Sequence, residues 1–207
     1  MRDKGRSDRW TKKAKSEGYA ARSVFKLEEI QRRERVLPKK GMVLDLGCSP
    51  GSWSQYVYRN SGKRVHLVGL DIKAVDDYLG TFVHGSVFKV GMDRLLEALG
   101  GYATVVLSDM APNTQGDRFT DHVRQIELAS AALRIARGVL RPGGDFVAKV
   151  FDGEDAQPYV DSVRQHFHKV RRIRPEVTRR QSVEFFVVGR GFREASRIVS
   201  DPDETPS

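Results

Sequence analysis

Residues 42–53 read MVLDLGCSPGSW, and this stretch decides the fold. Three apolar residues lead to a carboxylate at Asp45, and small residues and a proline follow it. This order predicts a buried strand, a tight turn and the start of a helix. Gly47 and Gly51 lack a Cβ, so the backbone can turn sharply and lie close to a ligand. Ser52 is placed to cap the helix.

The next apolar stretch, RVHLVGLD at residues 64–71, ends in a second carboxylate, Asp71. A dinucleotide site requires G-x-G-x-x-G, in which the middle glycine lets the pyrophosphate approach the helix. This loop instead has Ser49 and Pro50, which disfavours a nucleotide-dependent oxidoreductase. Because a carboxylate at the end of a second strand suits ribose hydroxyls, the pattern indicates an adenosine ligand without a diphosphate.

Strand-like and helix-like stretches alternate along the rest of the chain. Helical patterns at residues 92–100, 121–140 and 156–167 separate apolar strands, among them ATVVLSDM at 103–110 and DFVAKVF at 145–151. This alternation predicts an α/β fold of the Rossmann-like type, with a mostly parallel seven-stranded sheet and helices on both faces. The last two strands, joined by a short segment, should add an antiparallel hairpin.

Length and composition indicate one domain of an ordinary globular protein. We expect a basic, mobile arm at residues 1–18, a single domain at 19–192 and an acidic, disordered tail at 193–207. No apolar run approaches the roughly 18 residues of a membrane span, so we expect a cytoplasmic protein without a membrane partner. The only cysteine, Cys48, excludes an internal disulfide and a cysteine-rich zinc site, and we expect no metal.

The net charge of +9 is concentrated in two zones. Residues 1–40 contain 14 Lys and Arg against 6 Asp and Glu, and residues 164–180 contain 7 against 1. A charge run alone can be a solvated face. Two such zones around an adenosine-type site favour a polyanionic partner, which we expect to be RNA.

Four polar residues stand in otherwise apolar surroundings: Lys26, Asp109, Lys149 and Glu184. Each has an alternative explanation by itself. Lys26 can lay its stem along apolar surface, and Glu184 can be a solvated carboxylate at a sheet edge. An unpaired lysine among Val147 and Phe151 is costly, so Lys149 should be paired or near the open end of its strand.

Together these residues resemble the Lys-Asp-Lys-Glu tetrad of the FtsJ-like RNA 2′-O-methyltransferases. The matching segments are ARSVFKLEEI, LSDMAPN, FVAKVFDGE and SVEFFVVG, and the loop D-L-G-x-x-P-G-x-W precedes the last three. The resemblance implies S-adenosylmethionine as cofactor. It also implies the following cofactor-binding residues: Gly47, Pro50, Gly51, Trp53, Asp71, Ser86 and Asp109. Ser86 departs from the family, which often has an acid at this position.

The resemblance further implies the reaction. The expected substrate is a uridine ribose 2′-hydroxyl of large-subunit ribosomal RNA, met within the large ribosomal subunit by a monomeric enzyme. Lys149 would act as a base or as an electrostatic stabiliser, and Lys26 would lower its pKa or hold a phosphate. Asp109 and Glu184 would orient the lysines and the ribose. Methylation of another RNA such as tRNA, or RNA binding without catalysis, remain alternatives.

Overall fold

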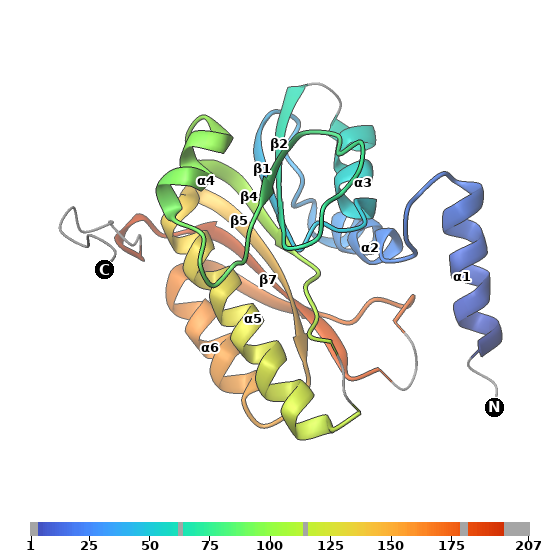
Figure 1. Cartoon of the computed structure of the whole chain (residues 1–207). Helices are drawn as coiled ribbons and strands as arrows, with labels where there is room; N and C mark the ends of the chain where they lie inside the picture. The colour runs from blue at the N-terminus through green and yellow to red at the C-terminus, as the bar shows by residue number, and fades with distance from the viewer. Residues whose placement is uncertain (1–3, 62–63, 114–115, 179–181, 197–207) are drawn as a thin grey trace.

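The computed structural model describes residues 4–61, 64–113, 116–178 and 182–196 and contains one seven-stranded sheet (Figure 1). The strands are β1 (Gly41–Leu46), β2 (Val65–Asp71), β3 (Thr81–His84), β4 (Ala103–Ser108), β5 (Leu140–Phe151), β6 (Phe167–Ile173) and β7 (Glu184–Phe192). Their order across the sheet is β3-β2-β1-β4-β5-β7-β6.

Strands β1 to β5 are parallel to one another, and β7 is antiparallel to both β5 and β6. This confirms the predicted α/β fold, including the antiparallel hairpin that completes the sheet. The reversal has a consequence for function. Because Phe151 near the end of β5 pairs with Glu184 at the start of β7, the beginning of β7 lies beside the carboxyl ends of the parallel strands.

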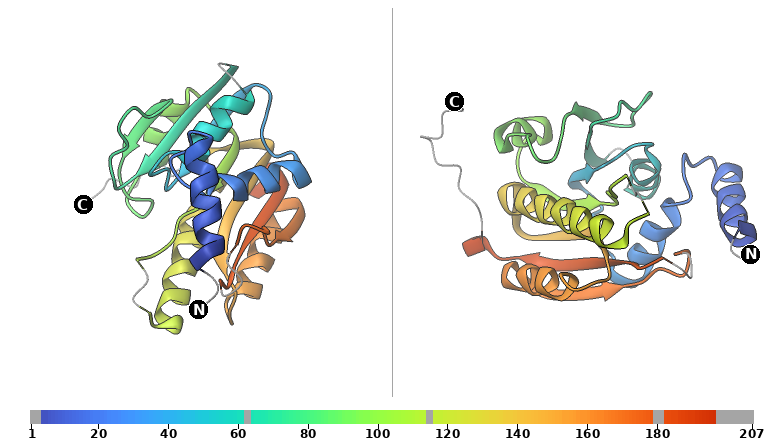
Figure 2. Two further views of the ribbon diagram at one scale, coloured as in Figure 1. Left: turned by 90° about the vertical axis from the view of Figure 1, so that its right-hand side faces the viewer. Right: turned by 60° about the horizontal axis from the view of Figure 1, so that its bottom comes forward.

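Helices cover both faces of the sheet (Figures 1 and 2). The helices are α1 (Lys4–Ser16), α2 (Val24–Glu34), α3 (Ser52–Ser61), α4 (Met92–Leu99), α5 (Arg118–Val139) and α6 (Ala156–His166). One core cluster joins α4, α5 and α6 to the sheet, and the other joins α1, α2 and α3 to its opposite face. Buried residues that alternate along β1 divide between the clusters, with Leu44 and Leu46 in the first and Val43 in the second.

The N-terminal arm differs from the expectation. Residues 4–16 form helix α1, which flanks α2 (Figure 2). Trp10 lies against Phe25 with ring centroids 5.1 Å apart, and Ala14 is 1% exposed. Because Trp10 and Ala14 are four residues apart, they lie on one face of the helix, but the stripe is too narrow to show as a periodic pattern. Most of the predicted tail, from residue 197 onward, lies outside the described residues.

Helix α2 ends at Glu34, and the next residue, Arg35, has a left-handed φ of 52°. One prediction about the loop after the first strand changes. Helix α3 begins at Ser52 itself, and the Ser52 hydroxyl bonds with the Ser23 hydroxyl at 2.8 Å instead of capping the helix. Among the residues that the structure describes, no helix is long and apolar enough to cross a membrane.

Candidate active site

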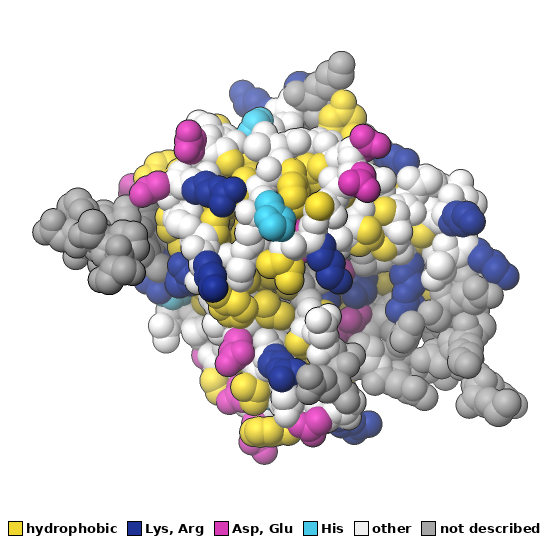
Figure 3. All heavy atoms as spheres, in the orientation of Figure 1, with side chains coloured by type: hydrophobic (Ala, Val, Ile, Leu, Met, Phe, Trp, Pro, Cys, Tyr) yellow, Lys and Arg dark blue, Asp and Glu magenta, His cyan; other side chains and the backbone are white. Residues whose placement is uncertain are grey.

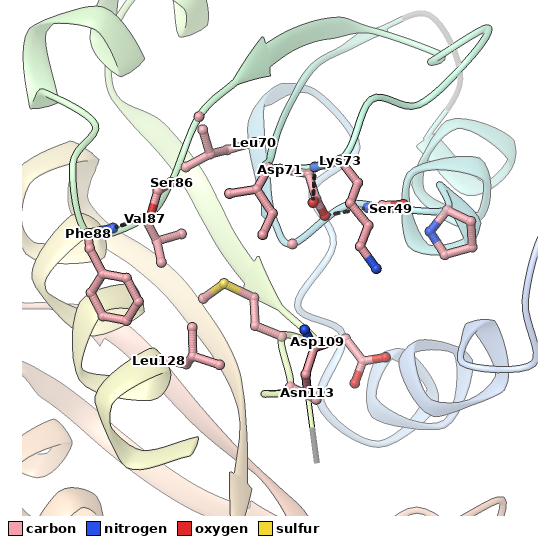
Figure 4. Close-up of a pocket in the computed structure, with 16 residues that line it drawn as sticks. Ser49, Leu70, Asp71, Lys73, Ser86, Val87, Phe88, Asp109, Asn113 and Leu128 are labelled. Carbon is pink, nitrogen blue, oxygen red and sulfur yellow. Dashed lines mark hydrogen bonds between the residues drawn. The ribbon is translucent and has the colours of Figure 1, made fainter. Parts of the chain in front are cut away.

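A pocket of about 440 Å³ opens where the strands β1, β2 and β4 end (Figure 4). Figure 4 shows Asp71 and Lys73 along one side of this pocket, Phe88 and Leu128 along another, and Asp109 at its base. In the view of Figure 3, apolar side chains are exposed across the middle of the same face of the molecule, among Lys and Arg side chains. The open ends of a parallel sheet are where such folds bind ligands.

Backbone amides hold the Asp71 carboxylate in place. Its Oδ2 accepts a hydrogen bond from the Ser49 amide at 2.9 Å, and its Oδ1 accepts one from the Lys73 amide at 2.8 Å. The loop after β1 is therefore bonded, through the Ser49 amide, to the Asp71 carboxylate at the end of β2. A carboxylate has about four lone-pair positions, so Asp71 can still accept from a ligand.

The turn at Gly47 brings this loop close to the residues after β4. Gly47 has a φ of 72°, and a Cβ there would lie 2.3 Å from Cγ of Met110, so no other residue fits without displacement. The Gly47 amide donates to the Leu70 carbonyl at 2.8 Å, which ties the loop to β2. Because Gly47 has no side chain, the ends of β1, β2 and β4 can lie close together.

Most of the predicted cofactor residues line this pocket: Gly47, Pro50, Asp71, Ser86 and Asp109. Gly51 and Trp53 do not. Trp53 borders a separate cavity of about 40 Å³, which shares Gly47, Ser49 and Asp109 with the larger pocket. The Trp53 indole is 3% exposed and its Nε1 donates to the Ser23 carbonyl at 2.9 Å, so its observed contacts anchor α3 to the segment before α2.

The four tetrad residues come together beside the pocket, from four different elements. The Asp109 Oδ1 lies 3.1 Å from Nζ of Lys149 and 3.4 Å from Nζ of Lys26. Lys26 also lies 2.9 Å from Oε1 of Glu184. Lys149 donates in addition to the Asp109 backbone oxygen at 2.6 Å. Asp109 belongs both to this cluster and to the pocket lining, so the two sites adjoin.

With this geometry, the comparisons with known proteins identify the family. The sequence profile of the FtsJ-like methyltransferases matches residues 19–192, which is most of the chain. The chain belongs to the FtsJ-like methyltransferase family.

Similar proteins extend this finding over nearly the full length. A protein of Desulfosudis oleivorans named ribosomal RNA large subunit methyltransferase E is 42% identical over 202 residues, which cover 95% of this chain and 97% of that protein. A protein of the same name from Sorangium cellulosum is 46% identical over 89% of this chain and 87% of its own length. These matches confirm the resemblance that the tetrad segments indicated.

A solved structure shows the same architecture. A Plasmodium falciparum protein described as a ribosomal RNA methyltransferase superposes with a TM-score of 0.76 at 25% identity. The match covers 84% of this chain and 98% of that one. This FtsJ-like methyltransferase therefore has the same fold as a protein of known structure.

The two lysines of this FtsJ-like methyltransferase differ electrostatically. Burial lowers the pKa of Lys149, repulsion from Lys26 adds to this effect, and attraction to Asp109 only partly opposes it. Burial also acts to lower the pKa of Lys26, but Asp109 and Glu184 together outweigh it, so that pKa is raised. Lys26 is thus the permanent cation and Lys149 the lysine that loses its proton more readily.

Asp109 remains a carboxylate in this cluster. Burial alone would raise its pKa, but the positive charges of Lys149 and Lys26 hold the pKa below the usual range. Glu184 accepts a further hydrogen bond from the Thr178 hydroxyl at 3.2 Å. The cluster therefore carries two cations and two carboxylates that are paired with each other, which is how buried charges are tolerated.

Several residues near the site were not predicted from the sequence. Phe88 and Ile72 line the pocket although they are 55% and 65% exposed. Ser23 borders the small cavity, and Gln125 contacts the backbone of the Lys149 strand. Gln125 could have been found, because it stands on the apolar stripe of α5 that Ala129 and Ala132 continue.

Proposed function

We propose that this protein transfers a methyl group from S-adenosylmethionine to the 2′-hydroxyl of a uridine in large-subunit ribosomal RNA. One observation carries the proposal. Lys149 and Lys26 converge on the single carboxylate of Asp109, and Asp109 also lines the adjoining pocket. The relatives named ribosomal RNA large subunit methyltransferase E support the choice of substrate.

The pocket lining fits S-adenosylmethionine. Asp71 offers a carboxylate to ribose hydroxyls, and Ser86 offers a hydroxyl that can accept from the adenine amino group. The side chains of Ile72, Val87 and Phe88 supply apolar surface for a flat base. A volume of about 440 Å³ is within the usual size range of small-molecule pockets. When bound, the cofactor supplies an electrophilic methyl group.

Lys149 is the residue that we assign to the ribose hydroxyl. A 2′-hydroxyl is a very weak acid, so its attack requires a group that removes the proton or stabilises the negative oxygen. A lysine with a lowered pKa gives up its proton at a lower pH than an ordinary lysine does. We assign it the role of general base, with Asp109 fixing the position of its Nζ.

Lys26 and Glu184 complete the cluster. Lys26 keeps its charge, so it can repel a proton from Lys149 or hold the phosphate of the target nucleotide. Glu184 pairs with Lys26 at 2.9 Å and lies at the start of β7, where it can accept from a ribose hydroxyl. We assign these roles because Lys26 pairs with two carboxylates, Asp109 and Glu184, whereas Lys149 pairs with Asp109.

The basic surface provides the RNA contacts in this proposal. Helix α1 presents the exposed side chains of Arg9, Lys12 and Lys15. Three arginines of the second basic zone already have partners within the protein: Arg171 pairs with Glu34, Arg172 lies over the Phe185 ring and Arg174 donates to the Ser182 carbonyl. Three exposed basic side chains on one helix make α1 the main candidate for phosphate contacts.

Methyl transfer with mapping of the modified nucleotide tests the proposal. Tritiated S-adenosylmethionine is supplied with large ribosomal subunits, with deproteinised ribosomal RNA or with tRNA, and the labelled nucleotide is identified by digestion and mass spectrometry. We expect label on a ribose 2′-oxygen of a uridine in large-subunit RNA. Label confined to tRNA, or on a base instead of a ribose, would contradict the proposal.

A further inference from the structure

The backbone ladder between β4 and β5 ends just before the catalytic cluster. Its last pair joins Ser108 to Ala148. The next residues along the two strands are Asp109 and Lys149, whose side chains must remain together for the proposed reaction. On its other side Lys149 pairs with Phe186 of β7, so only the side toward Asp109 lacks a ladder partner in the described register.

Gln125 spans this position from helix α5. Its side chain is within the core, with 1% of its surface exposed. Its Nε2 donates to the Lys149 backbone oxygen at 2.8 Å and to the Met110 backbone oxygen at 3.2 Å. Both neighbours are carbonyl oxygens, which only accept, so the amide must turn its NH₂ group toward them. One side chain therefore joins β5 to the segment that follows β4.

Both ends of this link reach functional residues. Lys149 is the proposed base, and the residue before Met110 is Asp109, which holds that base. Met110 also lines the cofactor pocket and lies against Gly47. A shift of either backbone segment would alter the distance between the Lys149 Nζ and Asp109, and a misplacement of about 1 Å can cost about 100-fold in rate.

We propose that Gln125 is a positioning residue, which bridges the Lys149 and Met110 carbonyls just beyond the last β4–β5 pair and so keeps Lys149 on Asp109. This inference rests on the proposed function, because it requires that Lys149 acts on the substrate. Gln125 touches neither the substrate hydroxyl nor the methyl donor in the proposed reaction. Its effect passes through the position of Lys149.

The test uses Gln125→Met, which keeps the length of the side chain and removes its donors. We expect the single-turnover rate with saturating RNA and cofactor to fall about tenfold or more. We also expect the pH of half-maximal rate to change, because the pKa of Lys149 depends both on its burial and on its contact with Asp109. Gln125→Asn, which is too short to reach both carbonyls, should behave in the same way if Gln125→Met does not fold.

Tyr159→Phe is the matched control. Tyr159 lies on α6, and its hydroxyl donates to the Ala129 carbonyl of α5, the helix that carries Gln125, at 3.0 Å in a buried position. Removing this bond takes one buried hydrogen bond away from α5 without touching Lys149, so we expect the parental rate and pH profile. If Tyr159→Phe loses activity as Gln125→Met does, the effect is general loosening of α5 and the inference is overturned.

Lys149→Ala separates the role of Gln125 from the proposed function. If Gln125→Met and Gln125→Asn keep the parental rate and pH profile while Lys149→Ala is inactive, the inference about Gln125 is wrong and the proposed function stands. If Lys149→Ala itself transfers methyl groups at the parental rate, the proposed function fails and the inference falls with it.

Discussion

Lys149 holds Asp109 at two points: its Nζ lies 2.6 Å from the backbone oxygen and 3.1 Å from the carboxylate Oδ1. This lysine of β5 is thus fixed to the residue that follows β4. Because the ammonium group of Lys149 contacts both the backbone oxygen and the carboxylate of Asp109, it has little freedom to move. A base held this firmly loses little entropy when it meets its substrate.

Lys149→Arg tests whether this residue is a base. A guanidinium stays protonated at any working pH, so it can stabilise a negative oxygen but cannot remove a proton. We expect Lys149→Arg to remain as slow as Lys149→Ala in single-turnover transfer, and the parental rate to increase with pH until Lys149 is neutral. Substantial activity of the arginine variant would mean that Lys149 is an electrostatic stabiliser.

Asp71→Asn tests the assignment of the ribose contact. The amide keeps one acceptor oxygen but loses the charge, and a hydrogen bond to a charged group contributes about 1.5–3 kcal/mol. We expect calorimetry to show S-adenosylmethionine affinity reduced by this amount. Asp76→Asn, at an exposed position of the following loop, is the control and should bind as the parent does. Unchanged affinity in Asp71→Asn would reject the ribose assignment.

Most of the fold and the tetrad could be predicted because both leave strong signals in the sequence. An apolar strand that ends in a carboxylate is uncommon, and Lys149 is conspicuous among Val147 and Val150. Gln125 was missed although its place on the apolar stripe of α5 is a signal of burial. The carbonyls that its amide contacts follow from how α5 packs on β5, which no local pattern states.

The docking of α1 could not be predicted for a related reason. The helix is nearly all polar, and its contact with the core depends on Trp10, Ala14 and their neighbour Phe25. Lys13 strengthens this contact, because its Nζ lies 4.5 Å from the centroid of the Phe25 ring. This contact joins α1 to α2, and the pattern of apolar residues within either helix does not predict a contact between them.

Helix α1 should contribute to the salt dependence of RNA binding. Replacing Arg9, Lys12 and Lys15 with glutamine removes exposed charge while leaving the Trp10 contact in place. We expect the slope of log affinity against log salt to flatten by roughly 0.7–0.9 for each phosphate that is no longer neutralised by a side chain. The control replaces Lys39 and Lys40, which lie just before β1, away from the open end of the sheet. A slope equal to the parental one in the α1 variant would exclude these residues from the RNA interface.

Asp45 should make stability depend on pH. Burial raises the pKa of this carboxyl to about 7, although the Ser54 hydroxyl donates to it at 2.7 Å. A carboxyl whose pKa is higher in the folded state than in the unfolded state destabilises the fold as pH rises between the two values. We therefore expect Asp45→Asn to be more stable than the parent at pH 8, by up to about 4 kcal/mol.

The gain in Asp45→Asn should shrink as the pH is lowered toward 4, where Asp45 is largely protonated in the folded state and the charge penalty disappears. Urea unfolding at several pH values measures this, with the exposed Asp76→Asn as reference. A stability difference that does not change between pH 4 and pH 8 would show that the pKa of Asp45 is not raised in the folded protein.

The most direct measurement is single-turnover methyl transfer by Lys149→Ala, with saturating cofactor and large ribosomal subunits, because it bypasses binding and product release. The control is Lys40→Ala, at an exposed position before β1. We predict parental cofactor affinity and a transfer rate reduced by roughly 10²–10⁴-fold, as is typical for loss of a general base. A parental transfer rate in Lys149→Ala would contradict the assignment of Lys149 as the base.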